Sequence, residues 1–168
     1  MIKTVHPTLI LCYLDFDGVL HDDEVYFDPR RGIYLGTPVR TLFEWVHILD
    51  DLFVPYPEVK IVLSTSWVRV KNFEFAKKCL PIGLQERVIG ATYHRREMID
   101  TPFDQMSRGQ QVWGDVLRRK AFRWFAIDND ARDWPEQCRN NLILTNDRTG
   151  ISELNVQQQI RERLVELS

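Results

Sequence analysis

Short apolar runs alternate along the chain with longer amphipathic stretches. Five of these runs are rich in strand-forming residues. Continuous apolar runs of this kind are typical of strands buried on both faces of a parallel sheet. The predicted strands cover residues 8–14, 60–63, 87–92, 122–127 and 141–144.

The stretches between these runs repeat apolar residues at helical spacing. Pro38 stands where a helix can begin, Pro55 stops the pattern, and Ser107 has the residue type of an N-cap. Helices are predicted between Pro38 and Pro55 and over residues 67–80, 109–120 and 153–167. This alternation predicts a single α/β domain over residues 1–168, with a parallel sheet covered by helices on both faces.

The composition is that of an ordinary globular domain. The chain has 168 residues, with 22 Lys+Arg against 24 Asp+Glu and a formal net charge of -2. That balance excludes a generally basic nucleic-acid coat protein but not a local basic groove. The 3 cysteines form no CxxC pair, which disfavours a zinc knuckle or a disulfide scaffold. The first apolar run is too short to span a membrane. We therefore expect a cytoplasmic protein with no membrane partner, and the pattern indicates no particular oligomeric state.

The sharpest feature is an Asp-x-Asp-Gly sequence at the end of the first predicted strand. Asp15 and Asp17 stand two residues apart, and Gly18 allows a tight turn after them. Two carboxylates this close repel each other and favour a divalent cation with oxygen ligands, most naturally Mg²⁺. An EF-hand does not fit, because its glycine is the sixth loop residue and Gly18 is the fourth from Asp15. A glycosyltransferase-type metal site and a turn without chemistry both stay open at this point.

Two further predicted strands end in residues suited to phosphate chemistry. Ser64 and Thr65 follow the second strand just before a helix, where hydroxyls and backbone N–H groups can bind an anion. Asp128 follows the fourth strand. Taken alone, Ser64 and Thr65 are better explained as a helix cap, and Asp128 is equally well explained as part of a solvated turn. Because the carboxyl ends of parallel strands meet at one edge, their recurrence favours a phosphoryl-transfer site there.

This combination resembles the haloacid dehalogenase (HAD) superfamily of aspartate-nucleophile phosphatases over nearly the whole chain. The segment from Asp15 to Gly18 is similar to the first family motif, Ser64 to the second and Asp128 to the fourth. The resemblance implies a Rossmann-like HAD fold with a five-stranded parallel sheet in the order 5-4-1-2-3. A closer resemblance is to the HAD domain of bacterial "Swiss Army knife" RNA-repair proteins, carried by residues 63–69, 87–92 and 149–151.

Two positions of the family pattern leave a choice. Arg108 best matches the cation of the third motif, because the family places it near the start of a helix and Lys120 lies at the far end. Asn129 stands where the family often has a second acid, so Asp130 is a candidate substitute for metal binding.

The resemblance also implies a mechanism. Asp15 is the expected nucleophile, which forms an aspartyl-phosphate. Asp17 is the expected general acid and base. Mg²⁺ is the expected cofactor, held by the Asp15 carboxylate, the Asp17 backbone carbonyl and Asp128. The expected phosphate-binding residues are Ser64, Thr65 and Arg108.

Two polar segments, residues 21–37 and 93–106, are predicted as a loop or small flap and an irregular insertion beside the site. Neither has room for an independent domain, so we expect no large cap domain and an open site. Residues expected at its substrate rim are His21, Trp67, Arg69, Arg95 and Arg96.

An open site favours a phosphorylated substrate of macromolecular size, such as a nucleic-acid end, over a small metabolite. The alternative is a domain that has kept the fold and lost turnover, and that senses phosphate or binds protein. The main support for that alternative is Asn129, which replaces an acid of the family pattern.

Overall fold

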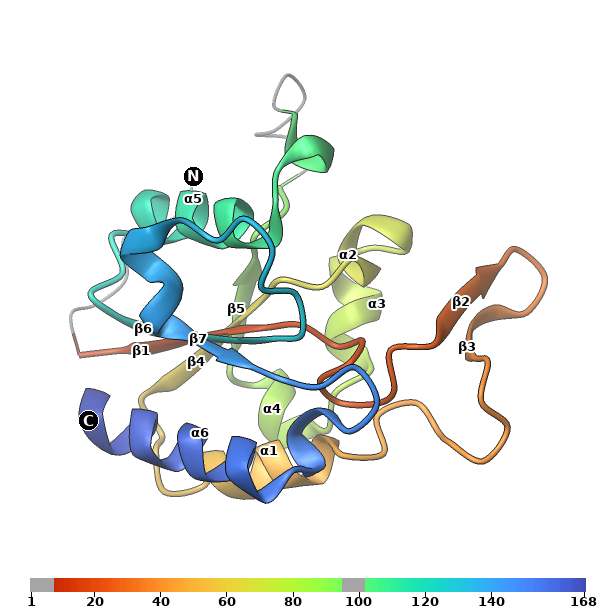
Figure 1. Ribbon diagram of the computed structural model, residues 1–168, viewed down its shortest axis with the longest axis horizontal. Coiled ribbons are helices and arrows are strands. Elements are labelled where there is room, and N and C mark those ends of the chain that lie inside the picture. Colours follow the sequence, from red (N-terminus) through yellow and green to blue (C-terminus); the bar gives the residue numbers. More distant parts are fainter. Residues whose placement is uncertain (1–7, 95–101) are drawn as a thin grey trace.

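The centre of the protein is a five-stranded parallel sheet in the order β5-β4-β1-β6-β7 (Figure 1). The structure is a computed structural model that describes residues 8–94 and 102–168. The strands of the sheet are β1 (Ile10–Leu14), β4 (Val59–Leu63), β5 (Val88–Ala91), β6 (Arg123–Asp128) and β7 (Leu142–Leu144).

The α/β class, the parallel sheet and the five strands agree with the sequence predictions. The strand labels differ from the expected 5-4-1-2-3 because β2 and β3 form a separate two-stranded sheet in the segment that the sequence predicted as a loop or small flap. When the five strands of the parallel sheet alone are counted along the chain, β7-β6-β1-β4-β5 corresponds to 5-4-1-2-3.

Helices cover both faces of the sheet (Figure 1). One face packs against α1 (Val46–Phe53) and α6 (Leu154–Leu167), and the other packs against α5 (Arg108–Arg119). Strand β1 has no exposed residue, and its side chains alternate between the two cores. Each buried Leu or Ile contributes on the order of 1.5–3 kcal/mol, so β1 is firmly fixed and its last residues are placed with it.

Two predicted helices are shorter than the sequence indicated. The helix expected to begin at Pro38 begins at Val46, because Phe43 has a positive φ of 61°, which a helix does not allow. The helix expected over residues 67–80 is split into α2 (Trp67–Val70) and α3 (Phe73–Lys78). Asn72 lies between them in an extended conformation, and its side chain accepts the Phe75 N–H at 2.8 Å, which caps α3.

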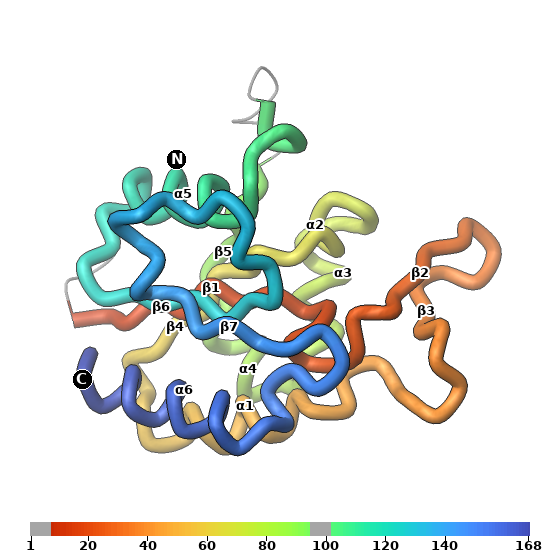
Figure 2. The backbone as a smooth tube through the Cα atoms, viewed as in Figure 1, coloured from red at the N-terminus to blue at the C-terminus, as the bar shows by residue number. Residues whose placement is uncertain are grey.

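The segment expected as a loop or flap contains a hairpin of β2 (Val25–Asp28) and β3 (Gly32–Leu35), which projects from the body (Figures 1 and 2). The insertion after β5 contains η1 (Phe103–Gln105), and its residues 95–101 lie outside the described part. The remaining short elements are α4 (Ile82–Gln85), η2 (Glu136–Asn141) and η3 (Gly150–Ser152). Within residues 8–94 and 102–168, neither segment forms a domain of its own, and no helix is both long and apolar enough to span a bilayer.

Candidate active site

The register of the sheet brings three polar residues to one level. Leu14 of β1 pairs with Leu63 of β4 and with Ile127 of β6. The next residue on each strand is therefore Asp15, Ser64 or Asp128. Two backbone hydrogen bonds maintain this alignment, from the Asp15 N–H to the Ile127 carbonyl at 3.2 Å and from the Ser64 N–H to the Leu14 carbonyl at 2.9 Å.

Asp15 and Asp128 form a buried acidic pair at this edge. Asp15 is 5% exposed and Asp128 is fully buried. Burial raises the pKa of Asp15 to about 6, and repulsion from Asp17 adds to the rise while Arg108 opposes it. Burial and the charge on Asp15 raise the pKa of Asp128 as well. Both carboxylates are thus poorly solvated, and their ionised forms need a cationic partner.

Arg108 supplies positive charge between the two acids. Its guanidinium lies 3.6 Å from Asp15 Oδ1 and 3.2 Å from Asp128 Oδ2. Arg108 is the first residue of α5, and a capping box between Ser107 and Gln110 fixes that end of the helix. Lys120, the alternative cation, has a left-handed conformation at the opposite end of α5 and is exposed. Of the two candidates, only Arg108 lies near the acids.

The two polar residues that follow Asp128 are bound to side chains other than Arg108. Asp130 accepts two hydrogen bonds from the Arg132 guanidinium, at 2.9 and 2.8 Å. Its backbone N–H donates to Asp128 Oδ1 at 2.9 Å. The Asn129 amide donates to Asp147 Oδ1 at 2.9 Å, so at this position an amide hydrogen-bonds to an acid that a second carboxylate would repel.

Two buried side chains contact the same carboxylate oxygen of Asp17. Its Oδ1 accepts the indole N–H of Trp67 at 2.8 Å and lies 3.0 Å from His21 Nε2. His21 is fully buried and Trp67 is 3% exposed. The sequence placed both residues at the substrate rim, whereas the structure buries them behind Asp17. Only two features of the sequence could have indicated these contacts. They are the polar His21 just after the first motif and the tryptophan, Trp67, at the start of the short helix α2.

Ser64 and Thr65 lie side by side at the end of β4, and both are buried. Thr65 Oγ1 accepts the Trp67 N–H at 3.3 Å. Within the described part of the chain, Ser64 Oγ and Asp128 Oδ2 are buried without a hydrogen-bond partner, although Asp128 Oδ2 has the ion-pair contact with Arg108. Buried polar atoms without partners are rare in folded proteins, so this position is suited to a bound polar group.

The oxygen atoms at this site fit Mg²⁺ as a partial set of ligands, to be completed by water and substrate. No group of three or more acidic, histidine or cysteine side chains that could hold a metal occurs among residues 8–94 and 102–168. Mg²⁺ is usually bound by one or two carboxylates, water and substrate phosphate rather than by a cage of side chains. The Asp15 and Asp128 carboxylates with the Asp17 carbonyl would match that pattern, since among the described residues Asp128 Oδ2 has an ion-pair contact with Arg108 but no hydrogen-bond partner.

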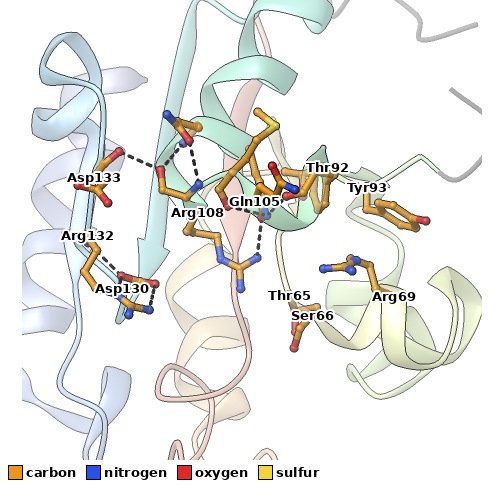
Figure 3. A pocket seen from close by; sticks show the side chains of 15 residues that line it. Thr65, Ser66, Arg69, Thr92, Tyr93, Gln105, Arg108, Asp130, Arg132 and Asp133 are labelled. Atoms are coloured by element: carbon orange, nitrogen blue, oxygen red, sulfur yellow. Dashed lines mark hydrogen bonds and ion pairs between the residues drawn. The ribbon is translucent and has the colours of Figure 1, made fainter. Parts of the chain in front are cut away.

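A polar pocket of about 670 Å³ opens beside these acids. Figure 3 shows the Arg69 and Arg108 side chains pointing toward the space between them, with Arg132 further along the wall. Arg69 pairs with Asp104 and lies 5.6 Å from the centre of the Tyr93 ring. Arg69 therefore lines the pocket, and its predicted place at a substrate rim stays a prediction. Arg95 and Arg96, the other two predicted rim cations, lie outside the described residues.

A comparison with protein families gives one match. The model of the family described as "HAD domain in Swiss Army Knife RNA repair proteins" matches residues 11–156. The match begins in β1 and ends in α6, so it includes all of the strand ends described above. Searches of the curated proteins and of the solved structures found no match.

Proposed function

The chain belongs to the family of HAD domains found in Swiss Army Knife RNA repair proteins, and we propose that it is a Mg²⁺-dependent phosphomonoester hydrolase. The observation that carries the proposal is the sheet register, which sets Asp15, Ser64 and Asp128 at one level. Arg108 lies within 3.6 Å of both acids, so a nucleophile, a hydroxyl and a cation are available to one phosphate.

The first half of the reaction transfers the phosphoryl group to the protein. A carboxylate oxygen of Asp15 attacks phosphorus, and the bond from phosphorus to the leaving oxygen breaks. The leaving oxygen keeps the electron pair and takes a proton from Asp17. Arg108 and Ser64 hold the remaining phosphate oxygens. Bound Mg²⁺ would supply charge that offsets the repulsion between an anionic nucleophile and an anionic substrate.

The second half of the reaction releases phosphate. Asp17, now ionised, takes a proton from a water molecule as that water attacks phosphorus. The bond between phosphorus and Asp15 breaks, and the carboxylate is regenerated. Phosphate leaves with the oxygen of water, and the protein returns to its starting state.

The phosphate of a nucleic-acid end is the substrate class that the site supports best. The pocket beside the acids is open, and it is lined by Arg69 and Arg132 in addition to Arg108. Guanidinium groups at the mouth of an open pocket are suited to the further phosphates of a polymer. The description of the family as RNA repair proteins points in the same direction.

A phosphate-sensing or protein-binding domain without turnover is the alternative. Its main support was Asn129, which takes the place of a second acid. The amide of Asn129 donates to Asp147, and Asp128 keeps an oxygen without a hydrogen-bond partner in the described part of the chain. The Asn129 side chain thus has a structural role that does not require loss of turnover, and we favour the enzyme.

A phosphatase screen tests the proposal. The substrates are p-nitrophenyl phosphate, small sugar phosphates, and oligonucleotides with a 3′- or 5′-phosphate, each with and without Mg²⁺. We expect Mg²⁺-dependent release of phosphate by the wild type and none by Asp15→Asn. Binding of phosphorylated oligonucleotide without turnover by the wild type would favour the alternative.

A further inference from the structure

We propose that His21 and Trp67 are positioning residues that decide which oxygen of Asp17 carries the transferred proton. The inference rests on the proposed function, since it concerns how the general acid is held. Both side chains contact the same atom, Asp17 Oδ1. The other oxygen, Oδ2, is therefore the one left for the substrate.

The histidine tautomer follows from the backbone around it. The Phe43 N–H donates to His21 Nδ1 at 3.1 Å, so Nδ1 is an acceptor and the proton of the neutral ring is on Nε2. Nε2 then donates to Asp17 Oδ1 at 3.0 Å. The residue that makes this contact, Phe43, has a positive φ of 61°. A strained backbone at this position is accounted for by its role in fixing His21.

Aromatic rings close off the region behind Asp17. Phe43 lies 4.8 Å from His21 and 5.2 Å from Trp67, measured between ring centres, and both pairs are edge to face. Phe16 lies 5.7 Å from Trp67. His21 and Trp67 are buried among these rings, and hydrogen bonds in a buried, weakly polar region are stronger than in water, so the two N–H groups hold Oδ1 firmly.

These two bonds constrain the proton. A protonated carboxyl group has one hydroxyl oxygen and one carbonyl oxygen, and an oxygen that faces two N–H groups has no room for a proton of its own. Oδ1 is thus the carbonyl oxygen and Oδ2 carries the proton. The Asp17 side chain is 22% exposed and lines a second pocket, of about 410 Å³, which Asp15 and Arg108 also line. Because Oδ1 faces buried groups, Oδ2 faces that pocket.

The test compares two esters that differ only in their need for a proton. p-Nitrophenolate is a weak base that leaves without help, whereas an alkoxide is a strong base that needs the proton from Asp17. The ratio kcat/KM reports formation of the aspartyl-phosphate, in which the leaving oxygen departs. The variant is Trp67→Phe, which keeps an aromatic ring and removes the N–H. The control is Trp124→Phe, which makes the same change at a buried tryptophan in the opposite core.

For Trp67→Phe we expect kcat/KM to fall about 10-fold more on an alkyl phosphate than on p-nitrophenyl phosphate, a fraction of the 10²–10⁴-fold that general acid catalysis supplies. Trp124→Phe should change both esters equally. At the other donor, His21→Gln retains an N–H group and should keep more alkyl phosphatase activity than His21→Leu, relative to p-nitrophenyl phosphatase activity.

An equal loss on both esters for Trp67→Phe, in a variant that melts at the temperature of Trp124→Phe, would overturn the positioning role while leaving the phosphatase in place. A wild type that hydrolyses neither ester would instead overturn the proposed function and the inference with it. If Trp67→Phe does not fold, the comparison of His21→Gln with His21→Leu decides alone: equal discrimination between the esters overturns the inference.

Discussion

The two acids of the first motif are only two residues apart, yet their surroundings are opposite. Asp15 lies between two strands at the edge of the sheet and beside another acid, and burial raises its pKa to about 6. Asp17 lies in the turn beyond the strand, and its Oδ1 accepts one hydrogen bond from Trp67 and faces His21. The sheet therefore places one carboxylate where it needs a cation, and loops place the other where N–H groups hold it.

The surroundings of Asp15 therefore control its charge, whereas those of Asp17 control the orientation of its carboxyl group. A nucleophile that must approach a phosphate benefits from weak solvation, because a desolvated anion interacts strongly with a cation at the same site. A proton donor must present one oxygen and keep the other away from the substrate. Substitutions can alter the surroundings of either acid separately.

Removal of the Asp15 charge should have the largest effect. Asp15→Asn should reduce turnover by on the order of 10⁴-fold or more, as expected when a catalytic nucleophile is lost. The variant should still fold, because the amide has nearly the same volume and relieves the repulsion with Asp128. Rates with Mg²⁺ and thermal melts measure the two effects. Turnover close to that of the wild type would exclude Asp15 as the nucleophile.

Much of the Asp15 side of the comparison could be predicted from the sequence. Apolar runs that end in Asp15, Ser64 and Asp128 predict strands whose ends meet, because parallel strands share one edge. The contact of Trp67 with Asp17 joins residues 50 positions apart, and His21, the other partner of Asp17, accepts a hydrogen bond from the backbone of Phe43, which has a positive φ. Nothing in local propensity indicates a positive φ at a phenylalanine. The hairpin of β2 and β3 was also missed, because its strands are short and half exposed.

The proposed Mg²⁺ site requires a choice between Asp128 and Asp130 as the metal-binding acid. Asp128→Asn should weaken Mg²⁺ binding about 10- to 100-fold, because a buried carboxylate oxygen without a hydrogen-bond partner in the described part of the chain would be lost. Asp130→Asn should change it little, because the Asp130 carboxylate is bound to Arg132. Calorimetric titration with Mg²⁺ measures both affinities. The opposite ranking would identify Asp130 as the ligand.

The raised pKa of Asp15 predicts a dependence of stability on pH. The unfolded carboxyl group has an ordinary pKa of 3.8, while the folded one holds its proton up to about pH 6. The folded state therefore binds more protons between these values, and its stability falls as the pH rises from about 4 to 7. Each pKa unit corresponds to about 1.4 kcal/mol, so the metal-free protein should lose up to roughly 3 kcal/mol.

Urea titrations at several pH values measure this loss. Asp15→Asn removes the group and should reduce the fall in stability. Saturating Mg²⁺ should also reduce it, since a cation at this position favours the ionised acids. A wild type whose stability rises with pH over this range would mean that Asp15 is ionised and well compensated in the fold.

The smallest effect is expected for substitutions at the pocket rim. The rim contacts neither Asp15 nor Asp17 in the proposed mechanism, and it would bind only the part of the substrate beyond the reacting phosphate. Arg69→Gln should raise KM for a phosphorylated oligonucleotide a few-fold and reduce the salt dependence of log KM by about one unit of slope, the contribution of one phosphate contact. The p-nitrophenyl ester lacks the further phosphates that Arg69 is proposed to contact, so its kcat/KM should stay unchanged. Arg163→Gln is a matched control, because Arg163 lies on α6 and not in the pocket. A substrate preference for small sugar phosphates that Arg69→Gln leaves intact would mean that the pocket does not receive a polymer, even if the chemistry at Asp15 and Asp17 is as proposed.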